Sequence, residues 1–355
     1  MMHNNFGVSQ EAAPFPLETQ LPYRIVSNAI EFLDSTGDRP FALWVSFPEP
    51  HNPYQVPRPY FDMFPPDSLP PRDVGPEVLE RKGWKWEYLR KLQEETYPGY
   101  DSYWRRTRSN YLGMLRLIDD QIDRLLRHLG PRLDNTIVLY LADHGDYFCD
   151  YGLNRKGVGL VEALTRIPMV WAGLGIRAQQ NHPAFVSTAD VLPTLCEAIG
   201  AAMPAGVQGR SLWPLLQGSD YPRAEFETIY AEVGFGGMHY GPDDEIPKSW
   251  GRIPGPPGAI PSFDELNPVT QSGNTKMVRR AEWKLTYDMM GNGQLYNLAE
   301  DPYELKNLFG QPRVADVQHR LMADLLRWTI RTQDDLPLAV YTHKWPKRNW
   351  YASYR

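Results

Sequence analysis

The chain has 355 residues, of which 42% are hydrophobic, and its formal net charge is -6 at pH 7. This length and composition are enough for one large domain or two smaller ones with a buried core. The acidic balance offers no basic surface for nucleic acid, and no apolar run approaches the roughly 20 residues that cross a bilayer. The two cysteines, Cys149 and Cys196, exclude a disulfide framework and a four-cysteine zinc site.

The N-terminal part predicts a helix, a strand and a loop that carries a histidine. Apolar residues recur with a helical period over Ile25–Leu33, and the short apolar run Phe41–Phe47 is typical of a buried strand. The proline-rich segment that follows places His51 on a loop just beyond the carboxyl end of this strand. Residues 57–100 are rich in proline, tryptophan and charge, so we expect an irregular surface excursion there.

Helical and strand patterns then alternate up to residue 200. They predict a long amphipathic helix through 111–129, a strand at 135–142, a strand at 166–173 and a helix at 187–200. This order is typical of an α/β fold with a mostly parallel sheet sandwiched by helices. Ligands of such sheets bind beyond the carboxyl ends of the strands, which is where His51, Asp143 and His144 fall.

In the last third of the chain the apolar patterns are shorter and less regular. A Gly/Pro-rich insertion occupies 234–261, and two short strands around the turn at 291–293 precede a helix at 314–333. We therefore expect an α/β core over 1–220, and over 221–355 the insertion followed by a small α+β subdomain with a closing helix.

The segment "LADHGDYFCDYGLNRKGVG" carries the residues of chemical interest. The Asp143 carboxylate and the His144 imidazole suit a divalent cation, although a complete shell requires at least one further acid-bearing segment. Lys156 can neutralise an anionic substrate oxygen, and His51 can protonate a leaving group, which indicates hydrolysis of a phosphate or sulfate ester. The plainer alternatives are a proline turn at His51, a turn and helix cap at Asp143 and His144, and a solvated Arg155–Lys156 pair.

Several motifs in order resemble the formylglycine-dependent sulfatases of the alkaline phosphatase superfamily. "DRPFALWVSFPEPHNPY" is similar to the strand and Pro-His-x-Pro loop of that family, and "LADHGDYFCDYGLNRKGVGLVEALTRIPMVWAG" to its Asp-His-Gly metal segment, substrate lysine and next strand. "VSTADVLPTLCEAIG" and "GQLYNLAEDPYELKNL" resemble two further segments. The resemblance extends through most of the chain and implies an alkaline phosphatase-like fold.

The resemblance also implies roles for four residues. Asp143 and His144 become ligands of Ca²⁺, with Mn²⁺ or Mg²⁺ as alternatives. Lys156 becomes a contact to the sulfate oxygens, and His51 a sulfate-binding residue that protonates the leaving group. The implied substrate is a sulfated small molecule or carbohydrate, attacked by a formylglycine hydrate.

The family places its nucleophile, in a C/S-x-P-x-R motif, before the histidine loop, and that motif does not occur there in this chain. Cys149 and Cys196 lack the motif, and Ser68, in "SLPPR", follows the histidine loop. The sequence thus predicts the C-terminal two thirds of a sulfatase, inactive alone and without a nucleophile. The alternatives are a phosphodiesterase or phosphonate monoester hydrolase of the same superfamily, or a non-catalytic binding protein. No compartment or oligomeric state follows from the sequence.

Overall fold

The computed structural model describes residues 7–179, 181–236, 239–247, 252–253, 262–263 and 265–333. The chain forms two compact units, each built from several segments. Unit 1 comprises Met1–Thr136, Asp146–Val158 and Tyr240–Thr270, and unit 2 comprises Ile137–Gly145, Gly159–His239 and Gln271–Arg355. Much of the Gly/Pro-rich insertion lies outside the described residues, and the domain boundary at residue 220 stays a prediction.

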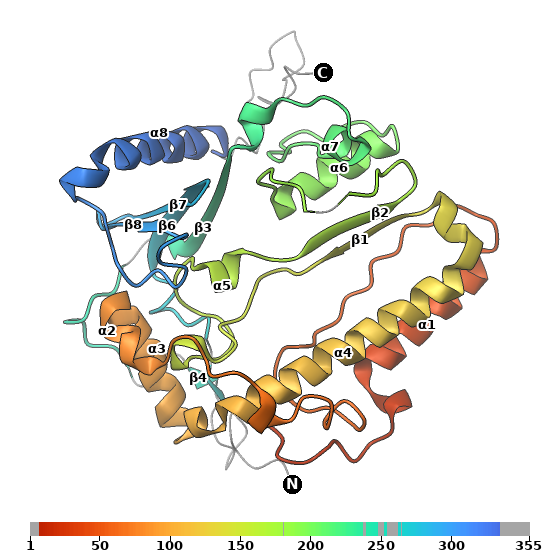
Figure 1. Ribbon diagram of the computed structural model, residues 1–355, viewed down its shortest axis with the longest axis horizontal. Coiled ribbons are helices and arrows are strands. Elements are labelled where there is room, and N and C mark those ends of the chain that lie inside the picture. Colours follow the sequence, from red (N-terminus) through yellow and green to blue (C-terminus); the bar gives the residue numbers. More distant parts are fainter. Residues whose placement is uncertain are drawn as a thin grey trace. The chain divides into compact units, whose positions relative to one another are not determined.

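Unit 1 is mainly helical in its described part. Its elements are α1 (Leu21–Thr36), α2 (Leu79–Lys82), α3 (Trp84–Thr96), α4 (Trp104–Leu129) and the paired short strands β4 (Arg252–Ile253) and β5 (Ser262–Phe263). The predicted helices at 25–33 and 111–129 are confirmed by α1 and α4, which pack side by side (Figure 1). Each ends at a glycine with positive φ, Gly37 at 53° and Gly130 at 50°, where the chain leaves the helix at little steric cost.

Two expectations about unit 1 were wrong. Residues 57–100 contain the 13-residue helix α3, whose buried face of Trp86, Leu89 and Leu92 is hidden in the sequence among charged residues. Phe41–Phe47 forms no strand with a described partner, although its side chains alternate between half-buried and exposed, as in an extended chain. The apolar character of this segment therefore predicted its extended conformation, but it did not predict whether the segment pairs with a strand.

Unit 2 holds most of the described strands. Its elements are β1 (Ile137–Leu141), α5 (Glu162–Thr165), β2 (Met169–Gly173), α6 (Val191–Ala198), α7 (Trp213–Gln217), β3 (Thr228–Gly236), β6 (Gly273–Arg280), β7 (Trp283–Asp288), β8 (Gly293–Asn297) and α8 (Ala315–Arg331). The mixture of helices and sheets agrees with the predicted α/β class. The strands expected at 135–142 and 166–173 are confirmed by β1 and β2, and the helix expected at 187–200 by α6.

The pairing of β1 with β2 differs from the expected parallel arrangement. The two strands run antiparallel, with Ile137 opposite Gly173 and Leu141 opposite Met169. Parallel neighbours need a crossover of a dozen or more residues, usually a long helix, that returns the chain to the starting end of the sheet. The connection between β1 and β2 holds a 3-10 turn at Asp150–Gly152 and the four-residue α5 but no long helix, and the chain re-enters the sheet at the end where it left.

The C-terminal part of unit 2 contains a four-stranded antiparallel sheet in the order β3-β6-β7-β8, with α8 packed against it (Figure 1). Its buried core joins strand residues such as Val278 and Leu285 to Leu321 and Trp328 of α8. The predicted hairpin around 291–293 and the closing helix are thereby confirmed. No helix within the described ranges is long and apolar enough to cross a membrane.

Candidate functional site

A cluster of three cationic side chains surrounds one carboxylate in unit 1. His51, Arg155 and Lys156 all approach Glu265, which lies in a turn more than one hundred residues further along the chain. Arg155 Nη1 lies 3.0 Å from Glu265 Oε2, and both side chains are buried. His51 Nε2 and Lys156 Nζ lie 3.6 and 3.7 Å from the other carboxylate oxygen, Oε1. The structure thus brings together His51 and Lys156, the two predicted substrate-binding residues.

The loop that carries Lys156 is held by hydrogen bonds within itself. Asp146 Oδ1 accepts the backbone N–H groups of Phe148 and Arg155, at 2.7 and 3.2 Å. The Tyr147 hydroxyl donates to the carbonyl oxygen of Val158 at 2.5 Å and accepts its N–H at 2.9 Å. Arg155 has a φ of 65°, a strained value for a residue with a side chain. These bonds fix the backbone on both sides of Lys156.

His51 reaches the cluster from the proline-rich loop. The His51 backbone N–H donates to the carbonyl of Pro48 at 3.0 Å, and ring atom Nδ1 lies 3.0 Å from the carbonyl oxygen of Asn52. A carbonyl oxygen only accepts, so Nδ1 carries a proton in this arrangement. Nε2 is then the nitrogen that is available to exchange a proton, and it faces the cluster.

The Glu265 carboxylate and the cations around it stabilise each other's charged forms. Burial alone raises the pKa of Glu265, but the contacts with His51 and Arg155 outweigh it and lower the pKa to about 2. The same contact with Glu265 raises the pKa of His51 against the opposing effects of burial, Lys156 and Arg155. Glu265 is therefore ionised at neutral pH, and it favours the imidazolium form of His51.

Asp143 and His144 follow β1 in unit 2 and lie side by side. Asp143 Oδ1 accepts the N–H of His144 at 2.9 Å, Oδ2 lies 3.5 Å from His144 Nε2, and the Asp143 side chain is 87% exposed. The next residue, Gly145, donates to the carbonyl of Leu164 in α5 at 2.8 Å. A Cβ at Gly145 would lie 1.9 Å from the Ala163 carbonyl oxygen, so only glycine allows this close approach of the loop to α5.

A carboxylate beside an imidazole nitrogen is a donor set that binds divalent cations. Within the described ranges, no group of three or more His, Cys, Asp or Glu is arranged to hold a metal ion. Asp143 and His144 therefore suit two positions of a coordination shell and do not complete one. The calcium prediction, with manganese or magnesium as alternatives, stays a prediction.

The candidate nucleophiles within the chain are poorly placed for attack. Cys149 is buried, its thiol lies 3.0 Å from Asn154 Oδ1, and burial raises its pKa well above the usual range. Cys196 is buried in α6. Ser68 is an exposed residue of a surface turn, where its hydroxyl donates to the carbonyl of Pro65 at 2.7 Å. A thiol kept protonated is a weak nucleophile.

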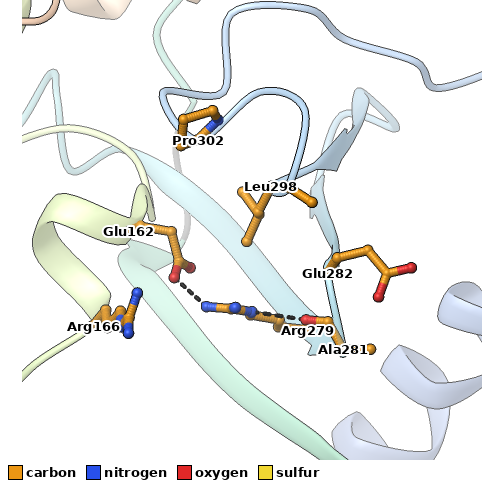
Figure 2. Close-up of a pocket in the computed structure, with 8 residues that line it drawn as sticks. Glu162, Arg166, Arg279, Ala281, Glu282, Leu298 and Pro302 are labelled. Atoms are coloured by element: carbon orange, nitrogen blue, oxygen red, sulfur yellow. Dashed lines mark hydrogen bonds and ion pairs between the residues drawn. The ribbon is translucent and has the colours of Figure 1, made fainter.

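A pocket of about 370 Å³ lies in unit 2 and is drawn in Figure 2. It is lined by Glu162, Arg166, Arg279, Ala281, Glu282, Leu298, Ala299 and Pro302. One wall is an ion-pair network in which Glu162 binds both Arg279 and the buried Lys284. The opposite charges on its walls offset each other, so the pocket does not by itself indicate an anionic ligand.

Sequence reasoning missed Glu265 and left Arg155 without a role. Glu265 stands in the loosely patterned segment after the Gly/Pro-rich insertion, where no periodicity indicates burial. Only Arg155 had a sequence signal, its position next to Lys156. A cation there could lie in the same site as the predicted substrate lysine. The tryptophans of the 57–100 segment also carry no local signal, although Trp86 proves to be buried against Tyr147 and Tyr151.

Comparison with known proteins first defines the class of the fold. Phosphonate monoester hydrolase from Silicibacter pomeroyi superposes with a TM-score of 0.75 at 21% identity, covering 96% of this chain and 68% of that one. At this identity the likeness describes the fold alone, which is that of the alkaline phosphatase-like hydrolases.

The sulfatase family model matches residues 7–201, more than half of the chain, and the chain belongs to the sulfatase family of the alkaline phosphatase superfamily. It is 30% identical over 228 residues to the Delta 4,5-hexuronate-2-O-sulfatase of Bacteroides thetaiotaomicron, covering 62% of this chain and 40% of the relative. It is 27% identical over 340 residues to the sulfatase YidJ of Escherichia coli, covering 92% and 58%. The chain spans about half the length of these relatives.

Proposed function

We propose that the chain binds a sulfate ester through His51 and Lys156 and supplies these residues to a sulfuric ester hydrolase. The observation that carries the proposal is the cluster of His51, Arg155 and Lys156 in a member of the sulfatase family. Charge-assisted hydrogen bonds from such groups are the usual means of holding an anionic substrate. A sulfated carbohydrate is the proposed class of substrate, in line with the printed activity of the hexuronate sulfatase relative.

Each residue has a defined part in the proposed reaction. Lys156 neutralises a sulfate oxygen, and the imidazolium of His51 donates the Nε2 proton to the ester oxygen as its bond to sulfur breaks. Water replaces the alcohol on sulfur, so the products are the free alcohol and sulfate. Asp143 and His144 would hold a Ca²⁺ ion, whose Lewis acidity suits the polarisation of an ester oxygen.

The proposal includes no turnover by residues 1–355 alone, because Cys149, Cys196 and Ser68 are all poorly placed as nucleophiles. A phosphonate monoester or phosphodiester is the second candidate ligand. It is favoured by the fold likeness to a phosphonate monoester hydrolase and by the single negative charge that these groups share with a sulfate ester.

Binding of inorganic sulfate tests the proposal directly. We expect the chain to bind sulfate measurably by calorimetry, and the Lys156→Ala variant to bind it about tenfold or more weakly, the loss of one charge-assisted hydrogen bond. The matched control is Lys91→Ala, because Lys91 is an exposed helix residue in the same unit. Equal affinity in the Lys156→Ala and unaltered chains would remove Lys156 from the site. Comparing the Kd of 4-nitrophenyl sulfate with the Kd of a phenylphosphonate monoester then separates the two candidate ligands.

Calcium binding tests the proposed metal ligands. We expect millimolar Ca²⁺ to raise the melting temperature of the chain, because a ligand that binds only the folded state stabilises it by mass action. Asp143→Ala should abolish this rise, whereas Asp220→Ala, which alters an exposed acid of the same unit, should leave it intact. An unchanged rise in Asp143→Ala would place the ion elsewhere.

A further inference from the structure

Glu265 is an acid at the centre of a cluster that would bind an anion. Its carboxylate repels a sulfate group, so its presence there needs an explanation other than direct contact with the substrate. The side chain is only 9% exposed and reaches His51, Arg155 and Lys156 with its two oxygens. Two explanations are possible on charge grounds: the carboxylate either competes with the substrate or holds the cations in place for it.

The backbone around Glu265 is anchored, which favours a fixed carboxylate over a mobile competitor. The Thr270 hydroxyl donates to the Glu265 carbonyl at 3.1 Å. Asn267 Oδ1 accepts the N–H groups of Val269 and Thr270, both at 3.0 Å, and so closes the turn. A Cβ at Gly157 would lie 2.6 Å from the Glu265 carbonyl oxygen, so the turn packs directly on the residue after Lys156.

The two carboxylate oxygens make different contacts. Oε2 forms a short, buried ion pair with Arg155 Nη1 at 3.0 Å, within hydrogen-bond range. Oε1 lies 3.6 Å from His51 Nε2 and 3.7 Å from Lys156 Nζ, beyond that range. Oε1 therefore attracts both cations without a close hydrogen bond to either. Their N–H groups can still donate to an oxygen of a bound anion.

We propose that Glu265, held by Arg155, is a positioning residue that orients His51 and Lys156 toward the sulfate group. The role rests on the proposed function, and it assigns Arg155 to holding the carboxylate. Glu265 contacts neither the substrate nor the reacting atoms. Its effect on the reaction passes through the charge and the direction of the two cations.

The protonation of His51 gives the clearest readout. The charged groups that face its ring are Glu265, which raises its pKa, and Lys156 and Arg155, which lower it, as burial also does. Glu265→Gln removes the largest raising effect, so the pKa of His51 should fall below that in the unaltered chain. His51 then loses its proton at a lower pH, and sulfate binding is lost at a lower pH with it.

The experiment measures two quantities in the same samples. The pKa of His51 is followed by NMR of ¹³C-histidine-labelled chain, with the signal assigned through His51→Gln, and the sulfate Kd is measured at pH 5.5 and 7.5. For Glu265→Gln we expect a lower His51 pKa and, with one charge-assisted hydrogen bond to the anion lost, about tenfold weaker sulfate binding at pH 7.5. At pH 5.5, where a larger share of the histidine is protonated, the difference in sulfate binding between the two proteins should be smaller.

Two further variants separate charge from shape. Glu265→Asp keeps the charge and should retain most of the elevation of the His51 pKa, whereas Glu87→Gln, which alters an exposed acid of α3, should change neither quantity. An unmoved His51 pKa in Glu265→Gln, or tighter sulfate binding at pH 7.5, would overturn the positioning role and favour competition. Failure of the unaltered chain to bind sulfate would instead count against the proposed function itself.

Discussion

The Arg210→Met variant is expected to lose about 3–5 kcal/mol of unfolding free energy, the usual cost of removing one partner of a buried ion pair. Arg210 is 1% exposed, and its guanidinium lies 3.0 Å from Asp190 Oδ2. It also donates to the carbonyls of Phe185, at 3.1 Å, and Glu225. Methionine fills similar space but leaves the buried Asp190 carboxylate without its cation.

Urea unfolding followed by circular dichroism measures this loss. Arg327→Met is the matched control, because Arg327 pairs with Asp324 at 3.1 Å from a side chain that is 56% exposed. Asp324 is buried but keeps its ion pair with Arg280 at 2.8 Å, so the loss of the exposed Arg327 should cost only about 0–1 kcal/mol. A loss in Arg210→Met no larger than that of the control would mean that water or rearrangement compensates for the buried charge.

Lys284→Met is expected to lose a similar amount of unfolding free energy. It should also weaken calcium binding at the predicted metal ligands. The Lys284 ammonium is fully buried, 3.2 Å from Glu162 Oε1 and 3.0 Å from Glu304 Oε1. Its removal breaks the buried ion pair with Glu304, at a cost of about 3–5 kcal/mol. Glu304 Oε1 also accepts the N–H of Glu162 at 2.8 Å, at the first residue of α5.

The consequence for the metal ligands follows from α5. This helix accepts the Gly145 N–H and so supports the loop of Asp143 and His144. We expect the calcium-dependent rise in melting temperature to shrink in Lys284→Met. Lys306→Met, at an exposed position of the same unit, should keep both the stability and the calcium response. A full calcium response in Lys284→Met would show that the Asp143 loop holds its shape without the ion pairs of Lys284.

The elements that the sequence predicted are those whose signal is local. The apolar periods of α1 and α4, and the turn between β7 and β8, involve residues a few positions apart, and all three appear in the structure. Helix α3 was missed because its apolar face is narrow and lies among charged residues. The direction of β2 relative to β1 was missed because it depends on the path of the intervening chain.

The residues of the candidate site also divide into those with a local sequence signal and those without one. His51 and Lys156 could be singled out from their motifs and loops, and the structure brings them together around Glu265. Glu265 could not be predicted, because its partner Arg155 is 110 residues away and spacing at that range carries no information about contact. Arg155 could be seen in the sequence, but its role depends on the buried carboxylate that it holds.

The discontinuous build of unit 1 has a consequence for the chain as it leaves the ribosome. The loop Asp146–Val158 is synthesised well before Tyr240–Thr270, the last segment of its unit. Arg155 and Glu265 are 110 positions apart, and most of the residues between them belong to unit 2. At roughly 5–20 residues per second, Glu265 follows Arg155 by on the order of ten seconds. During that interval the cationic side chains of His51, Arg155 and Lys156 lack their carboxylate. Unit 1 can therefore be completed only after much of unit 2 has been made.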